Sequence, residues 1–321
     1  MYKRIILSLL TFLFSVGLVG QEPISKKEKN TKVHTTDNTI IEFDLGGVLI
    51  EERPRLTLKV ISHVLRKDWK KAIPAFIALW KMNKRSHKDA YGNKFFYDNA
   101  GEEIHGATFA MIQNGLSDPI LRDYTLDILF LIADAHVFKK GAETLLSILK
   151  KKGYKIGFAT NKDRIAYNDT AEAMAKKGMF LDQYADIVHT VYPTETQLMK
   201  DMAAYRNAER EKKEKGYYLE YPFFDYLVSA TLHAEETEKY IHMPRPKPEL
   251  PYIEKQREHA GKKYVLFFDD HQENVDAVNA YGHNMTGTYV TSIHDVAVKL
   301  HACGILTDEE YNEVERAVRK K

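Results

Sequence analysis

The sequence predicts an α/β fold in which helices cover a parallel β-sheet and a helical insertion follows the first strand. Two mostly apolar segments, residues 40–44 and 263–270, end in carboxylates, as buried strands do when they deliver polar groups to one edge of a sheet. Between them, a helical pattern over 143–152 ends at Gly153 and leads into a short apolar strand at 154–159. That order of helix, glycine and strand indicates the crossover connection of a parallel sheet.

The first strand ends at Asp44, and Gly46 and Gly47 follow it. Two glycines let the backbone turn tightly and approach a ligand closely. The same residues also suit an ordinary turn that Asp44 merely caps, so this segment alone leaves both interpretations open.

The first 20 residues have the pattern of a signal peptide. Lys3 and Arg4 precede an uncharged apolar run, residues 5–20, that ends in small residues. An uncleaved membrane anchor is the alternative, because the run is close to the length that spans a bilayer. Either interpretation predicts an exported protein, periplasmic or secreted. The polar residues 21–38 are expected to form a flexible tether.

The overall composition is that of a soluble globular protein, with 44% hydrophobic and 29% charged residues in a chain of 321. A net charge of +2 gives no electrostatic argument for a nucleic-acid partner. Cys303 is the single cysteine, so the monomer can form no internal disulfide, and its apolar surroundings predict a buried thiol.

Two stretches are predicted to be inserted into the core. Residues 54–135 carry apolar side chains at helical spacing around a loop at 91–106, and no strand is expected among them. The basic face of these helices is typical of a solvated surface; a phosphate-rich partner or an anionic membrane is the alternative. Residues 193–243 combine a charged helix with an aromatic cluster, interpreted as an enlarged loop with a packing patch, or alternatively as a substrate-facing flap.

The elements after the second insertion follow in order. A rigid, proline-rich segment at 244–249 precedes a helix at 249–259 and the second carboxylate-ended strand. A further helix and a short strand come next, and two helices close the chain. The second of these is predicted to begin with a capping box formed by Thr307 and Glu310.

Four segments resemble, in order, the motifs of the haloacid dehalogenase-like (HAD) hydrolase superfamily, on the branch that includes many phosphatases. They are the nucleophile segment Phe43-Asp44-Leu45-Gly46-Gly47-Val48-Leu49, the phosphate-binding segment Ala159-Thr160-Asn161, Lys247 with Pro248, and the acidic segment Phe268-Asp269-Asp270 with Asn274. Each is weak alone, but four in this order are specific. The resemblance implies a Rossmann-like three-layer parallel-sheet core (residues 39–53 and 136–321) with a helical cap at 54–135.

The resemblance also implies that Asp44 attacks a phosphate ester. Mg²⁺ would offset the repulsion between the two anions, because this ion binds carboxylate oxygens together with substrate phosphate. Its protein ligands would be the carboxylates of Asp44 and Asp270 and the backbone carbonyl of Gly46.

The remaining residues of the four segments would bind the substrate or support the site. Thr160 and the adjacent amide would hold the phosphoryl group, and Lys247 would neutralise charge on nucleophile and phosphate. Asp269 would orient Lys247, and Asn161 and Asn274 would be polar supports at the rim.

One position departs from the pattern of the superfamily's phosphatases. They usually carry an aspartate two residues after the nucleophile, which protonates the leaving group, and here that position is Gly46. General acid catalysis typically contributes about 10²–10⁴-fold, so a slow enzyme or a preference for good leaving groups is expected unless another group substitutes. Water or one of His63, His87 and His105 in the insertion could do so.

These features favour a Mg²⁺-dependent phosphatase acting on a small phosphorylated metabolite. A non-catalytic relative that uses the scaffold to bind a partner is the first alternative. A dehalogenase is the second: it needs no leaving-group acid, but it leaves the paired Asp269 and Asp270 without a role. No nucleic-acid partner is expected, and contact with a membrane is expected only if residues 5–20 stay attached.

Overall fold

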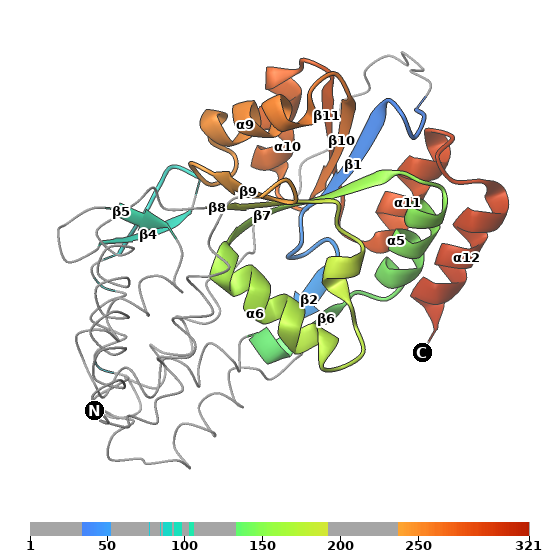
Figure 1. The fold of residues 1–321 in the computed structure, drawn as a ribbon, viewed down its shortest axis with the longest axis horizontal. Coiled ribbons are helices and arrows are strands. Elements are labelled where there is room, and N and C mark those ends of the chain that lie inside the picture. The colour runs from blue at the N-terminus through green and yellow to red at the C-terminus, as the bar shows by residue number, and fades with distance from the viewer. Residues whose placement is uncertain are drawn as a thin grey trace, which may run out of the picture.

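The computed structural model describes residues 34–52, 77, 84, 86–91, 93–97, 103–105, 133–191 and 237–320 (Figure 1). Its core is a six-stranded sheet with the order β11-β10-β1-β7-β8-β9, in which every neighbouring pair of strands is parallel. The strands are β1 (Thr39–Phe43), β7 (Lys155–Asp163), β8 (Ile187–Val191), β9 (Tyr240–Met243), β10 (Tyr264–Asp269) and β11 (Met285–Tyr289). The predicted α/β fold with a parallel core is confirmed.

Helices cover both faces of this sheet, so the core has three layers (Figure 1). One face packs against α9 (Leu250–Ala260) and α10 (Gln272–Tyr281); the other packs against α5 (Ala142–Lys151), α6 (Arg164–Ala175), α11 (Ile293–Ala302) and α12 (Asp308–Arg319). A short 3₁₀ helix, η1 (Leu181–Gln183), precedes β8.

The central strand shows why two apolar faces form. Ile41 and Phe43 point into the core on the α5 and α11 face, whereas Ile40 points toward α9 and α10. A strand that is buried on both sides carries a nearly continuous apolar run, as the sequence of β1 does. The predicted capping box of the last helix is also confirmed, with Thr307 and Glu310 in reciprocal hydrogen bonds.

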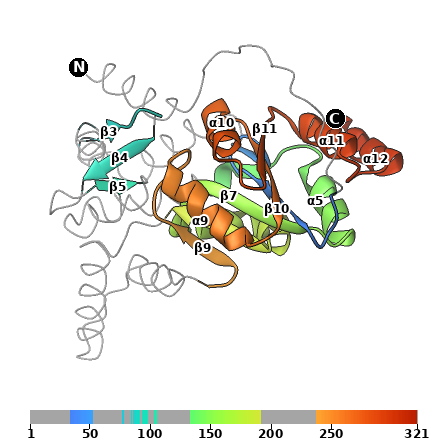
Figure 2. The same ribbon diagram turned by 90° about the horizontal axis from the view of Figure 1, so that it is seen from above.

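The insertion contains strands, so the prediction that residues 54–135 are free of strand is wrong. β3 (His87–Lys88), β4 (Lys94–Tyr97) and β5 (Glu103–His105) form a small antiparallel sheet, and Figures 1 and 2 place it on the side of the core opposite α11 and α12. The two strands that flank the insertion, β2 (Ile50–Glu52) and β6 (His136–Phe138), pair antiparallel with each other.

Asn93 lies in the turn between β3 and β4, and the aromatic residues that follow favour a strand. Phe95 and Phe96 are buried, and the Asp89 carboxylate accepts hydrogen bonds from the amides of Tyr91 and Asn93. The helices predicted in this insertion lie outside the described residues, apart from the isolated positions 77 and 84.

Three further predictions need correction. The insert 193–243 ends earlier, because β9 (Tyr240–Met243) is the edge strand of the main sheet. The tether 21–38 is too long, since Tyr154 donates a hydrogen bond to the carbonyl of His34 and the amide of Tyr264 donates to that of Asn38. Cys303 is exposed rather than buried.

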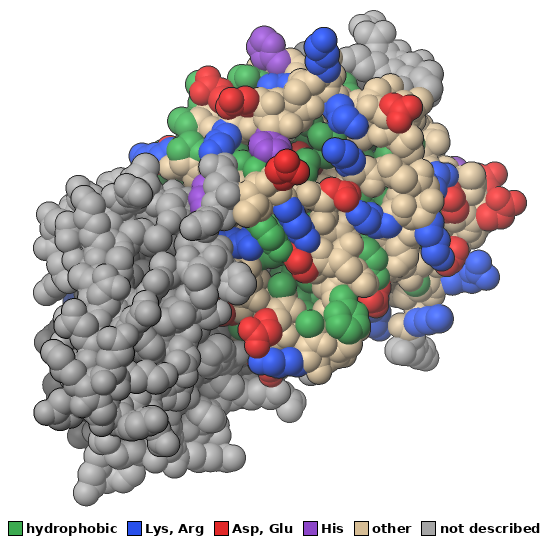
Figure 3. Space-filling view, viewed as in Figure 1, with side chains coloured by type: hydrophobic (Ala, Val, Ile, Leu, Met, Phe, Trp, Pro, Cys, Tyr) green, Lys and Arg blue, Asp and Glu red, His purple; other side chains and the backbone are tan. Residues whose placement is uncertain are grey.

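The predicted signal peptide (1–20), the first part of the tether (21–33) and most of the second insert (193–236) lie outside the described residues and stay predictions. Among the described residues, no helix is both long and apolar enough to cross a bilayer. The face in Figure 3 shows basic and acidic side chains interspersed over its described surface.

Candidate active site

Asp44 lies at the carboxyl-terminal edge of the sheet, immediately after β1. Its amide donates a 2.8 Å hydrogen bond to the carbonyl of Phe268, so the backbone continues the pairing with β10 for one more residue. β10 itself ends at Asp269. Because both strands are parallel and in register, their acidic ends meet at the same edge, where open α/β sheets bind ligands.

Lys247 reaches this edge from the segment between β9 and α9. Its Nζ lies 2.7 Å from Asp44 Oδ1, 2.7 Å from Asp269 Oδ2 and 2.9 Å from the carbonyl oxygen of Ala159. All three ammonium protons therefore have acceptors, and the side chain is buried. Burial alone would lower the pKa of Lys247, but the two carboxylates hold it above its ordinary value.

Asp269 is fully buried and is fixed from two further directions. Asn274 Nδ2 donates to both of its oxygens at 3.0 Å, and the amide of His271 donates to Oδ1 at 2.8 Å. Asn274 therefore supports the site, as predicted, but it is buried rather than at the rim. Asp269 does hold Lys247, as predicted from the acidic segment.

The site can accommodate a divalent cation. One oxygen from each of Asp44, Asp269 and Asp270 lies within 4.8 Å of the others. Asp270 Oδ1 is buried and, in the part of the chain that the structure describes, has no hydrogen-bond partner. An unsatisfied carboxylate oxygen beside two other carboxylates fits an ion such as Mg²⁺, which prefers oxygen ligands.

The raised pKa values of two of these carboxyl groups also fit a site for a cation. Burial raises the pKa of Asp44 to about 7, against the opposing charge of Lys247, and burial also raises the pKa of Asp270. Only one ammonium group faces this acidic cluster within hydrogen-bonding distance in the described region. A bound cation would favour the ionised form of these groups.

The close approach of the Asp270 side chain requires a glycine at position 47. It has a φ of +80°, and a Cβ at this position would lie 1.9 Å from Asp270 Oδ2. Its carbonyl also accepts a hydrogen bond from Lys139 Nζ. Gly46 differs, because a Cβ there would meet only Asp44 Oδ2, at 3.9 Å. A side chain therefore has room at position 46, next to Asp44, but a glycine places no acid there.

Thr160 and Asn161 lie near the end of β7, the strand next to β1. Thr160 is buried, and its Oγ1 accepts the amide of Lys162 at 3.1 Å. Asn161 Oδ1 accepts the amide of Lys247 at 2.8 Å, so its side chain holds the lysine-bearing segment. The structure brings both residues to the same edge as Asp44; their contact with a substrate stays a prediction.

Asn93 was not identified from the sequence. It belongs to the turn between β3 and β4, and its Nδ2 donates to the carbonyl of Lys247 at 2.8 Å and to Asp89 Oδ2 at 2.9 Å. The Arg245 guanidinium lies 5.6 Å from the ring centre of Phe95 in the same hairpin. The insertion thus contacts the segment that carries Lys247 directly. This contact joins residues far apart in the sequence, so no sequence pattern indicated it.

Of the histidines considered as substitutes for the missing acid, His87 is the one whose side chain the structure describes. His87 stacks on Phe95 within the insertion, with ring centres 5.5 Å apart. His63 and the side chain of His105 lie outside what the structure describes.

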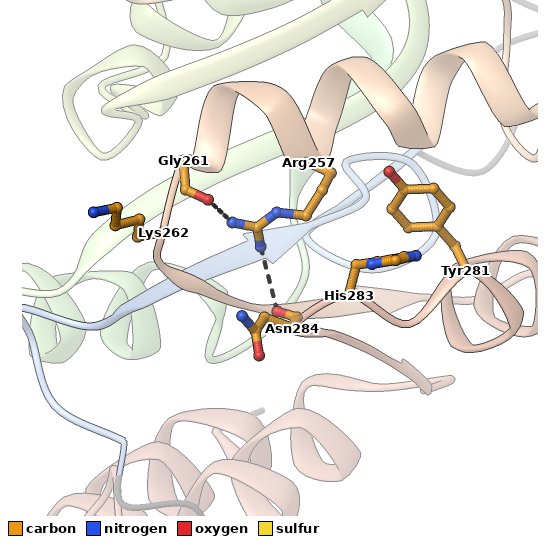
Figure 4. Close-up of a pocket in the computed structure, with 6 residues that line it drawn as sticks. All are labelled: Arg257, Gly261, Lys262, Tyr281, His283 and Asn284. Atoms are coloured by element: carbon orange, nitrogen blue, oxygen red, sulfur yellow. Dashed lines mark hydrogen bonds between the residues drawn. The ribbon is translucent and has the colours of Figure 1, made fainter.

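A hollow of about 420 Å³ lies at the opposite end of the sheet, before the first residue of β10 (Figure 4). It is lined by Arg257, Gly261, Lys262, Tyr281, His283 and Asn284. Figure 4 shows the Arg257 guanidinium turned toward the carbonyls of Gly261 and Asn284; it also donates to the carbonyl of Lys263, so the backbone holds it in place. This hollow is not part of the acidic site.

Three carboxylates and a buried lysine thus meet at the carboxyl edge of a parallel α/β sheet, an arrangement that fits a hydrolase. The family model for haloacid dehalogenase-like hydrolases matches residues 39–282, and the chain belongs to this family. The matched range includes every predicted site residue. No curated protein sequence matches the chain.

Proposed function

We propose that the protein is a Mg²⁺-dependent phosphatase that hydrolyses a small phosphate monoester through an aspartyl-phosphate on Asp44. The observation that carries this proposal is the convergence of Lys247 on Asp44 and Asp269, with Asp270 beside them. A nucleophilic carboxylate, a fixed cation and further oxygen ligands are what phosphoryl transfer with a divalent ion requires.

Each residue of the site has its own role in the proposed reaction. Asp44 attacks phosphorus, the bond from phosphorus to the ester oxygen breaks, and the leaving oxygen takes up a proton. Water then attacks the phosphorus of the aspartyl-phosphate, which releases phosphate and restores the carboxylate. Lys247 holds the nucleophile in place and offsets its negative charge, while Thr160 and nearby amides hold the phosphoryl oxygens.

Asp44, Asp270 and the carbonyl of Gly46 are the proposed Mg²⁺ ligands, with Asp269 beside them holding Lys247. When bound, the ion would neutralise charge on the phosphoryl oxygens and the nucleophile. The buried Asp270 oxygen without a hydrogen-bond partner in the described region supports this assignment.

The two other functions are less well supported by the site. A dehalogenase would use Asp44 without a metal, and the clustering of Asp270 with Asp44 and Asp269 would then be unexplained. A non-catalytic binding protein would have no need to keep Lys247 buried between two carboxylates, an arrangement with a high desolvation cost.

Hydrolysis of p-nitrophenyl phosphate by purified residues 21–321 tests the proposal. We expect Mg²⁺-dependent release of nitrophenol, its loss on chelation, and its abolition by Asp44→Asn. Asp276→Asn makes the same chemical change at an exposed position of α10 and should leave the activity unchanged. Inactivity toward a broad panel of phosphate esters together with no Mg²⁺ binding would favour the binding protein, and metal-independent halide release would favour the dehalogenase.

A further inference from the structure

A second lysine, Lys162, lies at the same sheet edge as the proposed nucleophile. It follows Thr160 by two residues near the end of β7, and β7 pairs directly with β1. Its backbone amide is bonded to Thr160 Oγ1, and its side chain is partly buried. Asp44 is among the carboxylates near enough to influence the pKa of Lys162. The four sequence motifs did not identify this residue.

A histidine rather than a carboxylate holds the ammonium group. Lys162 Nζ lies 3.4 Å from His136 Nε2, and His136 Nδ1 lies 3.3 Å from the carbonyl oxygen of Ala133. Because a carbonyl can only accept, we assign the imidazole proton to Nδ1, which leaves the Nε2 lone pair for the ammonium. His136 is buried at the start of β6, so this contact orients the lysine.

The two lysines of the site differ in their charge partners. Lys247 has carboxylate oxygens at 2.7 Å on two sides, whereas within the described ranges no carboxylate oxygen lies within 4.0 Å of Lys162 Nζ. Glu52, on β2, is 4.0 Å from His136 Nε2. A lysine without a close counterion can release its proton more readily than one that is paired.

We propose that Lys162 is the acid that protonates the leaving group, in place of the aspartate that is absent at Gly46. This inference rests on the proposed phosphatase function. As Asp44 attacks phosphorus and the bond to the leaving oxygen breaks, a proton passes from Lys162 Nζ to that oxygen and produces an alcohol and a neutral amine. When water attacks the aspartyl-phosphate, the amine takes the proton of the water, and phosphate, the Asp44 carboxylate and the ammonium result.

The acidity of the group suits this role. Burial lowers the pKa of Lys162 from its ordinary value, and this brings it closer to the pH at which a general acid works best. The lowering is opposed by four carboxylates: Glu52 on β2, Asp44 after β1, Asp169 on α6, and Asp163, which follows Lys162 on β7.

A comparison of leaving groups tests the proposal. p-Nitrophenyl phosphate has a good leaving group and benzyl phosphate a poor one, with rings of similar size. We expect Lys162→Met to lower kcat/KM for benzyl phosphate by about 10²–10⁴-fold and that for p-nitrophenyl phosphate by less than about tenfold. Lys162→Arg keeps the charge but cannot release a proton, so it should show the same selective loss.

Two controls accompany these variants. Lys155→Met removes an exposed lysine at the other end of β7 and should change neither rate. Gly46→Asp, introduced together with Lys162→Met, puts a carboxyl group where a side chain has room and should restore part of the benzyl phosphate rate. Such a rescue is not expected if Lys162 only supports the fold.

The pH dependence of the two wild-type rates tests the same proposal without relying on the folding of a variant. The benzyl phosphate rate should fall as the pH rises through the pKa of Lys162, because the amine then has no proton to donate, while the p-nitrophenyl phosphate rate should not. An equal loss on both substrates, or recovery of the benzyl rate by Lys162→Arg, overturns the inference and leaves the phosphatase standing. A wild type that is inactive on every ester overturns both.

Discussion

The sheet contains two groups of buried polar side chains that differ in how their charges are balanced. At the carboxyl edge, Lys247 forms ion pairs with Asp44 and Asp269. Two residues before Asp44, on the face covered by α9, Glu42 lies 3.7 Å from His189 and accepts a hydrogen bond from Gln256. The two groups share strand β1 and a similar degree of burial.

In this inner group, no lysine or arginine among the described residues forms an ion pair with the carboxylate of Glu42. Burial raises the pKa of Glu42 to about 7 and lowers the pKa of His189 to about 3, so both are predominantly neutral in mildly acidic solution. Within the described part of the chain, Glu42 Oε1 and both ring nitrogens of His189 have no hydrogen-bond partner. Gly157 makes room for this group, because a Cβ there would lie 2.6 Å from Glu42 Cγ.

The difference shows what makes a buried carboxylate available for chemistry. Removal from water favours the protonated form wherever no cation compensates. Burial raises the pKa of both Glu42 and Asp44 to about 7, but Asp44 also has a lysine at 2.7 Å and two neighbouring carboxylates with which it could share a metal ion. The position of Asp44 at the sheet edge gives a substrate access to its carboxylate, and Lys247 provides the positive charge beside it.

The largest effect is expected from removing that charge. Lys247→Met should lower kcat by at least about 10²-fold and destabilise the fold by about 3–5 kcal/mol, because Asp44 and Asp269 would be left buried without a counterion. The loss of stability should be larger at about pH 8 than at about pH 5, where the carboxyl groups can protonate. Steady-state kinetics and urea denaturation at both pH values measure these effects.

Lys150→Met is the matched control. Lys150 also has a carboxylate at 2.7 Å, that of Asp186, but both side chains are about one-third exposed. Exposed pairs contribute about 0–1 kcal/mol, so a small change is expected. If the two substitutions lower the stability equally, the contrast between the buried pairs of Lys247 and the partly exposed pair of Lys150 is wrong.

An intermediate effect is expected at the glycine beside the metal carboxylate. Gly47→Ala places a Cβ 1.9 Å from Asp270 Oδ2 at a φ of +80°, so the loop or the carboxylate must move. We expect weaker Mg²⁺ binding, at least about tenfold by calorimetry, and a lower rate at limiting Mg²⁺. Gly46→Ala has only an ordinary contact at 3.9 Å and should bind Mg²⁺ as the wild type does. Equal Mg²⁺ affinity in both variants contradicts the close approach.

The smallest effect on activity is expected in the inner group. Because the folded-state pKa of Glu42 is raised from 4.5 to about 7, its contribution to stability is complete below the lower value and is lost as the pH rises through the upper one. Glu42→Gln keeps the acceptor for Gln256 and removes this loss. The variant should therefore gain stability over the wild type between about pH 5 and about pH 8, by up to roughly 3 kcal/mol, with unchanged kcat. Denaturation curves that shift equally at both pH values would contradict the raised pKa.

Much of the fold and of the site could be predicted because local patterns agree with the tertiary structure. β1 and β10 are apolar runs that end at Asp44 and Asp269, and parallel pairing brings such ends together without further information. The unit of α5, Gly153 and β7 was also visible, since the helix period changes to a strand across one glycine with a φ of +84°.

The missed elements depend on contacts between distant residues. β8 includes His189 and Thr190, both fully buried, and polar residues of this kind obscure the apolar run that marks an inner strand. Lys162 and Asn93 acquire their places only when β6 and the β3–β4 turn fold against the sheet. No spacing in the sequence records either contact.

The most direct test of the central claim is a crystal structure of the protein with Mg²⁺ and beryllofluoride, an analogue of the phosphoryl group. The account predicts beryllium bonded to a carboxylate oxygen of Asp44, Mg²⁺ between Asp44 and Asp270, and Lys247 still in contact with Asp44. Beryllofluoride bound to another carboxylate, or Asp44 and Asp270 without an ion between them, would contradict it.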